Sequence, residues 1–155
     1  MALTLILMAF RFPLQALLRV RQSCEERERR RLALLNTQIG QLHQKHEILN
    51  QERVLAWAQI SQDLRGGMSG AELQFEMASM ATRAYRQQEL RKQIARLQQE
   101  RTAQERLFRE AQKQRKILDS LRERKLRDYL QVRGRQEQQQ VDDLFMLHRI
   151  SGSRS

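Results

Sequence analysis

The side chains that could support catalysis or bind a metal are few and scattered in this sequence. His43, His46 and His148 form no group with cysteines or carboxylates at metal-ligand spacing, and His46 fits a helix-packing position better. No serine or cysteine nucleophile has an identifiable base. The single cysteine, Cys24, cannot form an internal disulfide, which agrees with a reducing compartment. We therefore expect no catalytic residue, no metal site, no cofactor and no enzyme activity.

The glycine-rich segment Gly66-Gly67-Met68-Ser69-Gly70 could be taken for a phosphate-binding loop. It lacks the Lys-Ser/Thr pair of such loops, so it is interpreted as a turn. Gly66 and Gly67 can end a helix and supply the positive φ that a chain reversal needs. Ser69 and Glu72 have the spacing of a capping box, which starts a helix. The segment therefore predicts a helix end followed at once by a helix start.

Apolar residues at spacings of three and four flank this turn on both sides, as in a coiled coil. If the chain folds back, Ile39 meets Leu97 and Leu42 meets Ile94, and the two numbers of each pair add to 136. The pattern predicts an all-α fold: a long antiparallel two-helix coiled-coil hairpin. Its seam consists of Leu35, Ile39, Leu42, His46 and Leu49 before the turn, and of Leu90, Ile94, Leu97, Arg101 and Gln104 after it.

Composition supports one elongated helical domain without an interior large enough for a substrate pocket. The chain has one Pro, six Gly and 30% charged residues, and strand signals are absent. The predicted organisation is an apolar segment at 1–12, a single hairpin domain at 13–149 and a disordered tail at 150–155. Within the domain we expect one helix at about 13–64, a loop at 65–70 and a second helix at about 71–148.

The apolar N-terminal run Ala2–Phe10 is nine residues long, whereas a membrane-spanning helix needs about 20. Arg11 follows the run instead of preceding it, unlike in a secretory signal. We expect no transmembrane segment. Because Met8 offers a second start, residues 1–7 are either an upstream extension or part of the functional chain.

The half of the hairpin away from the turn has few apolar layers, because Arg21, Glu25 and Glu28 occupy seam positions. We expect this open half to be the less stable one. Beyond it, Lys125–Arg149 should overhang the first helix. The overhang has an apolar stripe that either the segment Phe10–Leu14 or a partner must cover: Leu126, Tyr129, Leu130, Val141, Leu144 and Phe145.

Positive charge is concentrated in two segments that the hairpin would bring together. Arg11–Arg31 has seven Arg against three Glu, and Lys113–Arg135 has nine Lys or Arg against three acids, so together they hold most of the net charge of +11. Such a surface could be merely solvated, bind nucleic acid, or bind an acidic protein. Nucleic acid is not expected, because Tyr129 is not part of an aromatic ladder that could stack bases.

The turn end has a different chemistry, with aromatic and methionine side chains within a few helical turns of the loop. A two-helix rod cannot bury all of them, although any single one could fill the seam. We expect some to be exposed and to form a patch for a partner, here named the partner patch: Trp57, Phe75, Met77, Met80 and Tyr85.

Both ends of the sequence resemble those of FliJ-type flagellar export proteins. The opening Phe10-Arg11-Phe12-Pro13-Leu14-Gln15-Ala16-Leu17-Leu18-Arg19-Val20-Arg21 is similar to the family's start. The segment Leu118–Arg124, with Tyr129, Arg135-Gln136-Glu137 and Val141-Asp142-Asp143-Leu144, is similar to its end. The resemblance extends from about Ala9 to Arg149.

The resemblance implies a non-enzymatic component of the flagellar type III export apparatus, similar to the stalk of rotary ATPases. Its implied partners are the export ATPase hexamer, the membrane export gate and export chaperones, in the bacterial cytoplasm at the inner membrane. The alternatives are the equivalent stalk of a virulence-type secretion system or a basic nucleic-acid or ribosome-associated coiled coil. The family motifs assign these residues to the ATPase ring: Phe10, Phe12, Leu14, Leu17, Leu18, Arg21, Leu121, Arg124, Tyr129, Arg135, Glu137 and Asp143.

Overall fold

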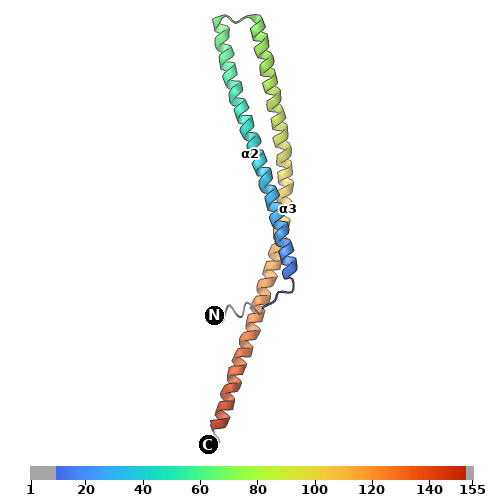
Figure 1. Ribbon diagram of the computed structural model, residues 1–155, viewed down its shortest axis with the longest axis vertical. Helices are drawn as coiled ribbons and strands as arrows, with labels where there is room; N and C mark the ends of the chain where they lie inside the picture. The colour runs from blue at the N-terminus through green and yellow to red at the C-terminus, as the bar shows by residue number, and fades with distance from the viewer. Residues whose placement is uncertain (1–9, 153–155) are drawn as a thin grey trace. The chain divides into compact units, whose positions relative to one another are not determined.

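The computed structural model describes residues 10–152, and two long helices account for nearly all of them. Helix α2 spans Gln15–Gly66 and helix α3 spans Gly70–Gly152, and the described residues contain no strand. Figure 1 shows α2 and α3 running antiparallel on either side of a short loop. The predicted all-α hairpin is confirmed. The proposed extension at 1–7 and the last three residues, 153–155, lie outside the described residues, whereas α3 continues to 152, beyond the end expected at about 148.

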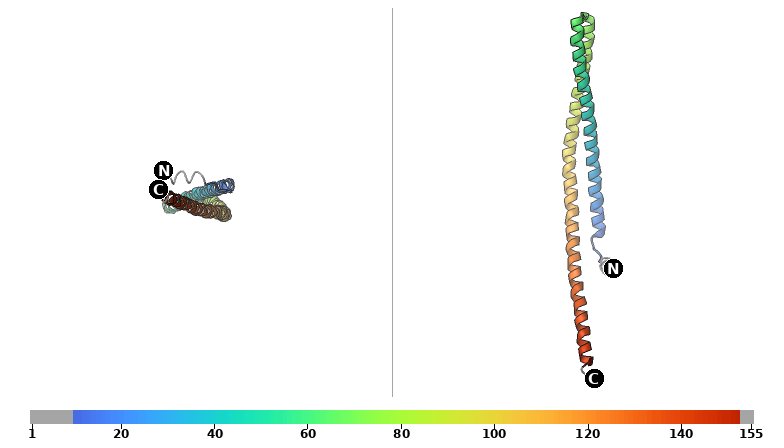
Figure 2. Two further views of the ribbon diagram at one scale, coloured as in Figure 1. Left: turned by 90° about the horizontal axis from the view of Figure 1, so that it is seen from below. Right: turned by 90° about the vertical axis from the view of Figure 1, so that its left-hand side faces the viewer.

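The described chain divides into two compact units, each built from both helices. The open unit contains the residues up to Glu25 together with those from Glu110 onward, and the loop unit is Glu26–Arg109. Within each unit α2 and α3 lie side by side, as Figure 1 and the right-hand view of Figure 2 agree. The prediction of a single domain at 13–149 stays a prediction.

The two sides of the loop are stabilised by different helix-capping motifs. At the end of α2, Gly67 has a φ of 94°, and the amides of Gly67 and Met68 donate to the carbonyls of Leu64 and Asp63 at 3.4 and 3.1 Å. This pattern is a Schellman motif, which satisfies carbonyls that the helix end would leave unpaired, and it favours glycine because of the positive φ.

The start of α3 is the capping box that the sequence predicts. The Glu72 amide donates to Ser69 Oγ at 3.2 Å, and the Ser69 amide donates to Glu72 Oε2 at 2.8 Å. The hydrogen bonds that the Glu72 carboxylate accepts from Ser69, first from its backbone amide and then from its side chain, hold the pKa of Glu72 below its ordinary value. The reversal therefore follows from residues 63–72 alone, since all of its hydrogen bonds are local.

Burial along the seam agrees with the predicted heptad positions. Leu35, Ile39, Ile94 and Gln104 are buried, and the other six predicted seam residues are half-buried. The cross-helix contacts also agree with the register. His46 accepts from Arg91 and Asn50 accepts from Gln87, and the residue numbers of both pairs add to 137. The register of the loop unit therefore lies within one helical turn of the sequence prediction.

Disulfide cross-linking tests this register. With Cys24 replaced by Ala, cysteines introduced for Ile39 and Leu97 are expected to form a disulfide within one chain under mild oxidation, because the predicted register places them in one layer of the seam. Non-reducing electrophoresis and mass spectrometry measure the product. A pair of cysteines placed at Ile39 and Arg106, about two and a half turns farther along α3 than Leu97, is the control and should not form a disulfide. Dimers linked between chains at 39 and 97 would contradict the hairpin.

Three buried polar side chains interrupt the apolar seam. Gln104 is 3% exposed and its Nε2 donates to Glu28 Oε2 at 2.6 Å and to the Glu28 carbonyl at 3.2 Å. The hydrogen bond from Gln104 is the main cause that holds the pKa of Glu28 below its ordinary value, against the opposite effect of burial. In the loop unit, Gln87 is equally buried and pairs with Asn50 at 3.3 Å. Each buried polar group has a partner across the seam, as low dielectric surroundings require.

The third buried polar group is charged and lies in the open unit. Glu25 is 3% exposed and forms an ion pair with Arg115, whose guanidinium also binds Asp119 one turn along α3. The two carboxylates, Glu25 first, raise the pKa of Arg115. The sequence placed Glu25 in the seam, but the sum of 136 puts it opposite Ala111, so it did not predict this ion pair with Arg115.

Candidate functional site

The open unit has a small apolar core made by the chain segment that precedes α2. Phe12, Leu18 and Leu118 form a buried cluster, and Phe10 and Leu121 pack against it. Leu18 is fully buried. The Phe10 ring lies 5.6 Å from that of Tyr129 between centroids, with the planes tilted by 50°. The first described residues thus fold back along α3 and cover the beginning of its overhang.

This core corrects part of the predicted ATPase-ring surface. The family motifs assign Phe12 and Leu18 to a partner surface, but they are 7% and 0% exposed and form the core instead. The side chains of Phe10, Arg21, Leu121 and Tyr129 are half-buried. The exposed members of the predicted set are Leu14, Leu17, Arg124, Arg135, Glu137 and Asp143. A direct role for these residues in ring binding stays a prediction.

The distal part of α3 leaves its apolar side chains open to solvent. Arg133 donates to Tyr129 Oη at 3.3 Å and to Glu137 Oε1 at 3.1 Å, and these contacts stay on one helix. Beyond them, Figure 2 shows α3 continuing past the start of α2 with no other described helix beside it. The exposed apolar side chains there include Leu130, Val132, Val141, Leu144, Phe145, Met146 and Leu147. Of the two predicted covers, the N-terminal segment therefore reaches Tyr129. Leu126 is also half-buried, whereas Leu130, Val141, Leu144 and Phe145 of the predicted stripe are exposed.

Basic side chains precede this stripe on the same helix. Arg122, Arg124, Lys125 and Arg127 are all exposed. We name these four residues the basic cluster of the open unit. Because they occupy no seam position, their charge can act on a partner without contributing to packing.

The loop unit exposes most, but not all, of the predicted aromatic and methionine patch. Trp57, Phe75 and Tyr85 are 48%, 73% and 64% exposed, whereas Met77 is half-buried. Met80 is only 6% exposed, which corrects its assignment to the patch. Like Ile60, which is also buried, it is a seam residue, since an unbranched thioether can fill a gap between helices.

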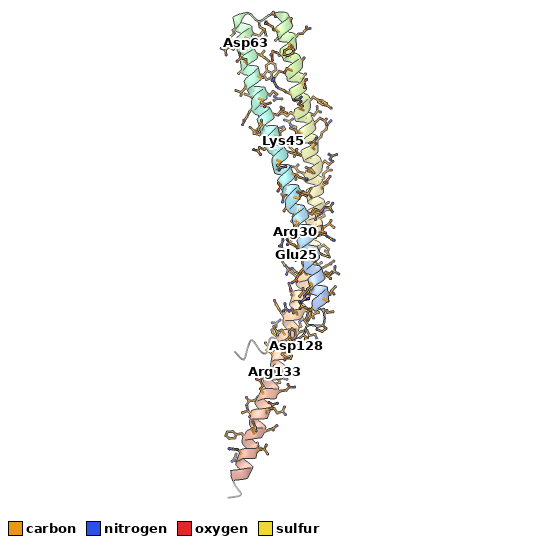
Figure 3. All side chains as sticks on the ribbon, viewed as in Figure 1. Glu25, Arg30, Lys45, Asp63, Asp128 and Arg133 are labelled. Carbon is orange, nitrogen blue, oxygen red and sulfur yellow. The ribbon has the colours of Figure 1, made fainter. Side chains whose placement is uncertain are left out.

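Tyr85 also lines a groove that the sequence did not reveal. The groove encloses about 430 Å³, and its apolar floor and walls include Ile48, Leu49 and Leu90. Lys45 and Glu52 on α2 and Arg86 and Glu89 on α3 flank it; Lys45 is labelled in Figure 3. Heptad spacing assigns Leu49 and Leu90 to the seam, but it gives no signal that the exposed Ile48 and Tyr85 line a common depression.

The chain matches the family described as Flagellar FliJ protein over residues 10–154. It belongs to the FliJ family. The match extends over nearly the whole chain, including both ends on which the sequence resemblance rests, and it favours the flagellar interpretation over a virulence-type stalk. Comparisons with curated proteins and with solved structures find no match.

Because the chain belongs to the FliJ family, it is a flagellar export-related protein. The family is a non-catalytic component of flagellar export, which supports the prediction that the chain is not an enzyme. Among residues 10–149, no group of three or more His, Cys, Asp or Glu could hold a metal ion. Neither described helix of this FliJ-family chain has an apolar stretch long enough to cross a membrane.

Proposed function

We propose that this FliJ-family chain couples the flagellar export ATPase hexamer to the membrane export gate and assists export chaperones during flagellum assembly. The proposal places it in the bacterial cytoplasm, peripherally at the inner membrane. The observation that carries it is the chemical difference between the two units. The open unit presents exposed cations and an uncovered apolar stripe, whereas the loop unit presents exposed aromatic side chains.

The open unit suits insertion into a ring of subunits. A single helix with apolar side chains such as Leu144 and Phe145 in solvent is unfavourable unless a partner covers them. A ring cavity can surround such a helix on all sides, which a flat surface cannot. The basic cluster at Arg122–Arg127 adds a long-range attraction to an acidic partner, which raises the association rate more than the affinity.

The loop unit suits a second, separate partner. Trp57 and Phe75 are large rigid side chains that lie outside the seam, and aromatic anchors of this kind commonly account for a large part of the binding energy at protein interfaces. We assign this partner to the export gate. Export chaperones would bind either the open unit or the loop unit. A competition experiment, in which the ATPase is added to the complex of the chain with a chaperone, distinguishes the two.

Alanine substitutions separate binding from folding in the loop unit. Trp57→Ala and Phe75→Ala are expected to weaken gate binding by about 2 kcal/mol or more, because the truncated anchors contact the partner, and to change the free energy of unfolding by less than about 1 kcal/mol. Met80→Ala is the matched control. It removes a buried side chain and should cost about 2 to 5 kcal/mol of stability instead.

Isothermal titration with the purified cytoplasmic domain of the gate, and urea unfolding followed by circular dichroism, measure the two quantities. Motility of cells with Trp57→Ala or Phe75→Ala should fall while the protein level is unchanged. If both variants lose stability and keep full gate binding, Trp57 and Phe75 are packing residues and the gate binds elsewhere.

A further inference from the structure

A second groove lies beside the loop, and its chemistry differs from that of the groove at Tyr85. It encloses about 530 Å³ and is lined by Asp63, Met68, Ala71, Glu72, Phe75 and Glu76. Phe75 is 73% exposed and Met68 is half-buried. Asp63 is the last acidic residue of α2 and lies next to the loop, as Figure 3 shows. The groove therefore combines an exposed aromatic ring with three carboxylates.

Like other acids such as Glu47 and Glu100, these carboxylates form no ion pair with a cation of the described residues, but here three of them line one groove. Glu26 pairs with Arg30 at 3.0 Å, and Glu89 pairs with Lys92 at 2.9 Å. Asp63 Oδ1 accepts from the side-chain amide Nε2 of Gln59 at 2.9 Å, and the Glu72 carboxylate accepts from the Ser69 backbone amide. Across residues 10–152, no ion pair joins Asp63, Glu72 or Glu76 to a Lys or Arg.

Local charge therefore opposes the charge of the chain. Residues 57–80 contain these three acids and one base, Arg65, so this segment has a net charge of −2 in a chain of +11. Unpaired carboxylates on one side of a basic protein create a local negative potential, which repels other anionic surfaces and attracts cations.

The spacing of the acids argues against a single bound ion. The described residues contain no group of three carboxylates close enough to hold a metal. Separated carboxylates around an apolar ring instead match several cations that are spaced along a chain. Lysine and arginine also bring apolar stems that pack on an aromatic ring, and their cationic heads favour its face.

We propose that this groove binds a basic segment of a partner protein, with an apolar or arginine side chain seated on Phe75 and flanking cations paired with Asp63 and Glu76. The inference rests on the proposed function only for the identity of the partner, the export gate. The chemistry of the segment follows from the groove itself.

Peptide binding tests the proposal. The probes are a synthetic peptide in which Lys or Arg alternates with Leu, and the same peptide with Glu in place of each cation, followed by fluorescence anisotropy. The basic peptide is expected to bind and the acidic one not. Asp63→Asn/Glu76→Gln should weaken binding roughly tenfold and flatten its salt dependence, and Phe75→Ala should weaken it at least as much at every salt concentration.

The matched controls keep the same chemistry elsewhere in the loop unit. Glu47→Gln/Glu100→Gln removes two exposed carboxylates, and Leu107→Ala truncates an exposed apolar side chain on α3. Both should bind the basic peptide like the original chain. If Glu47→Gln/Glu100→Gln weakens binding as much as Asp63→Asn/Glu76→Gln does, the attraction is general and the groove is not a site. Circular dichroism confirms that each variant remains helical.

Two further measurements identify the occupant. If sedimentation shows that the chain associates with itself and Asp63→Asn/Glu76→Gln abolishes this, the occupant is a second copy and the proposal is overturned. If the gate domain binds the original chain and Asp63→Asn/Glu76→Gln equally, the inference fails while the proposed function stands. If the basic peptide binds as expected and the gate domain does not bind at all, the inference stands and the proposed function fails.

Discussion

Reversing the charge of the basic cluster is expected to weaken binding of the export ATPase by roughly ten- to a hundredfold at low salt. The variant replaces Arg122, Arg124, Lys125 and Arg127 with Glu. All four side chains are exposed and none lies in the seam, so helicity should be unchanged. The physical reason is that the field which attracts an acidic partner changes sign. Surface plasmon resonance at several salt concentrations measures the affinity and the association rate.

The salt series separates steering from mere solubility. Binding of the original chain should weaken as salt rises, because exposed charges are screened beyond about 8 Å at physiological ionic strength. Binding of the reversed variant should depend less on salt or depend on it with the opposite sign. The control reverses four exposed arginines of the loop unit and should bind the ATPase normally: Arg31, Arg96, Arg106 and Arg109. Equal affinities of both variants at every salt concentration would assign the basic cluster to solubility.

The second large effect is expected at the buried ion pair of the open unit. Arg115→Met should lower the free energy of unfolding by about 3 kcal/mol or more, because it removes the cation that forms an ion pair with the Glu25 carboxylate in a site that is 3% exposed. Asp119 is 30% exposed on its side chain, so water can replace the lost contact there. Urea unfolding at neutral pH measures the loss.

A double substitution distinguishes the cost of a stranded charge from the value of the pair. Glu25→Leu/Arg115→Met removes both charges and fills the layer with apolar side chains, so its stability should return to within about 1 kcal/mol of the original chain or exceed it. We expect the pair to be retained for register, since a charged layer is satisfied only when Glu25 and Arg115 face each other. If the double variant is as unstable as Arg115→Met, the charges themselves stabilise the hairpin and this interpretation is wrong.

Local sequence patterns are enough to determine the two helices, the reversal between them and, to within one helical turn, the register of the loop unit. The reversal depends on residues 63–72, where Gly67 provides the positive φ and Ser69 and Glu72 cap each other. These are short-range hydrogen bonds, so the sequence alone predicts them. Heptad spacing in two segments with one common centre then leaves few registers that bury both stripes, and the contacts of Arg91 and Gln87 agree with the predicted one.

Family resemblance at both ends of the sequence also indicates the correct family, since the whole length from residue 10 to 154 matches FliJ. The residues that would bind partners are predicted less well. Phe12, Leu18 and Met80 are residue types that are common at protein interfaces. Here their side chains are buried by other residues of the same chain. The spacing of apolar residues shows which side chains share one face of a helix. It does not show what fraction of each side chain the neighbouring segment buries.

Only the tertiary structure decided which surfaces remain open. Whether Phe10 covers Tyr129 depends on how a non-helical segment folds back across more than a hundred residues of sequence, and no local pattern encodes that contact. The partners of Glu25 and Gln104 likewise depend on the rotation of one helix against the other. The acidic groove at Phe75 joins residues from the end of α2, the loop and the start of α3. The sequence specifies the helices and their pairing through short-range periodicity. Grooves and cores depend on the distance between the packed helices and on their rotation about their axes. Both quantities are fixed only by three-dimensional packing.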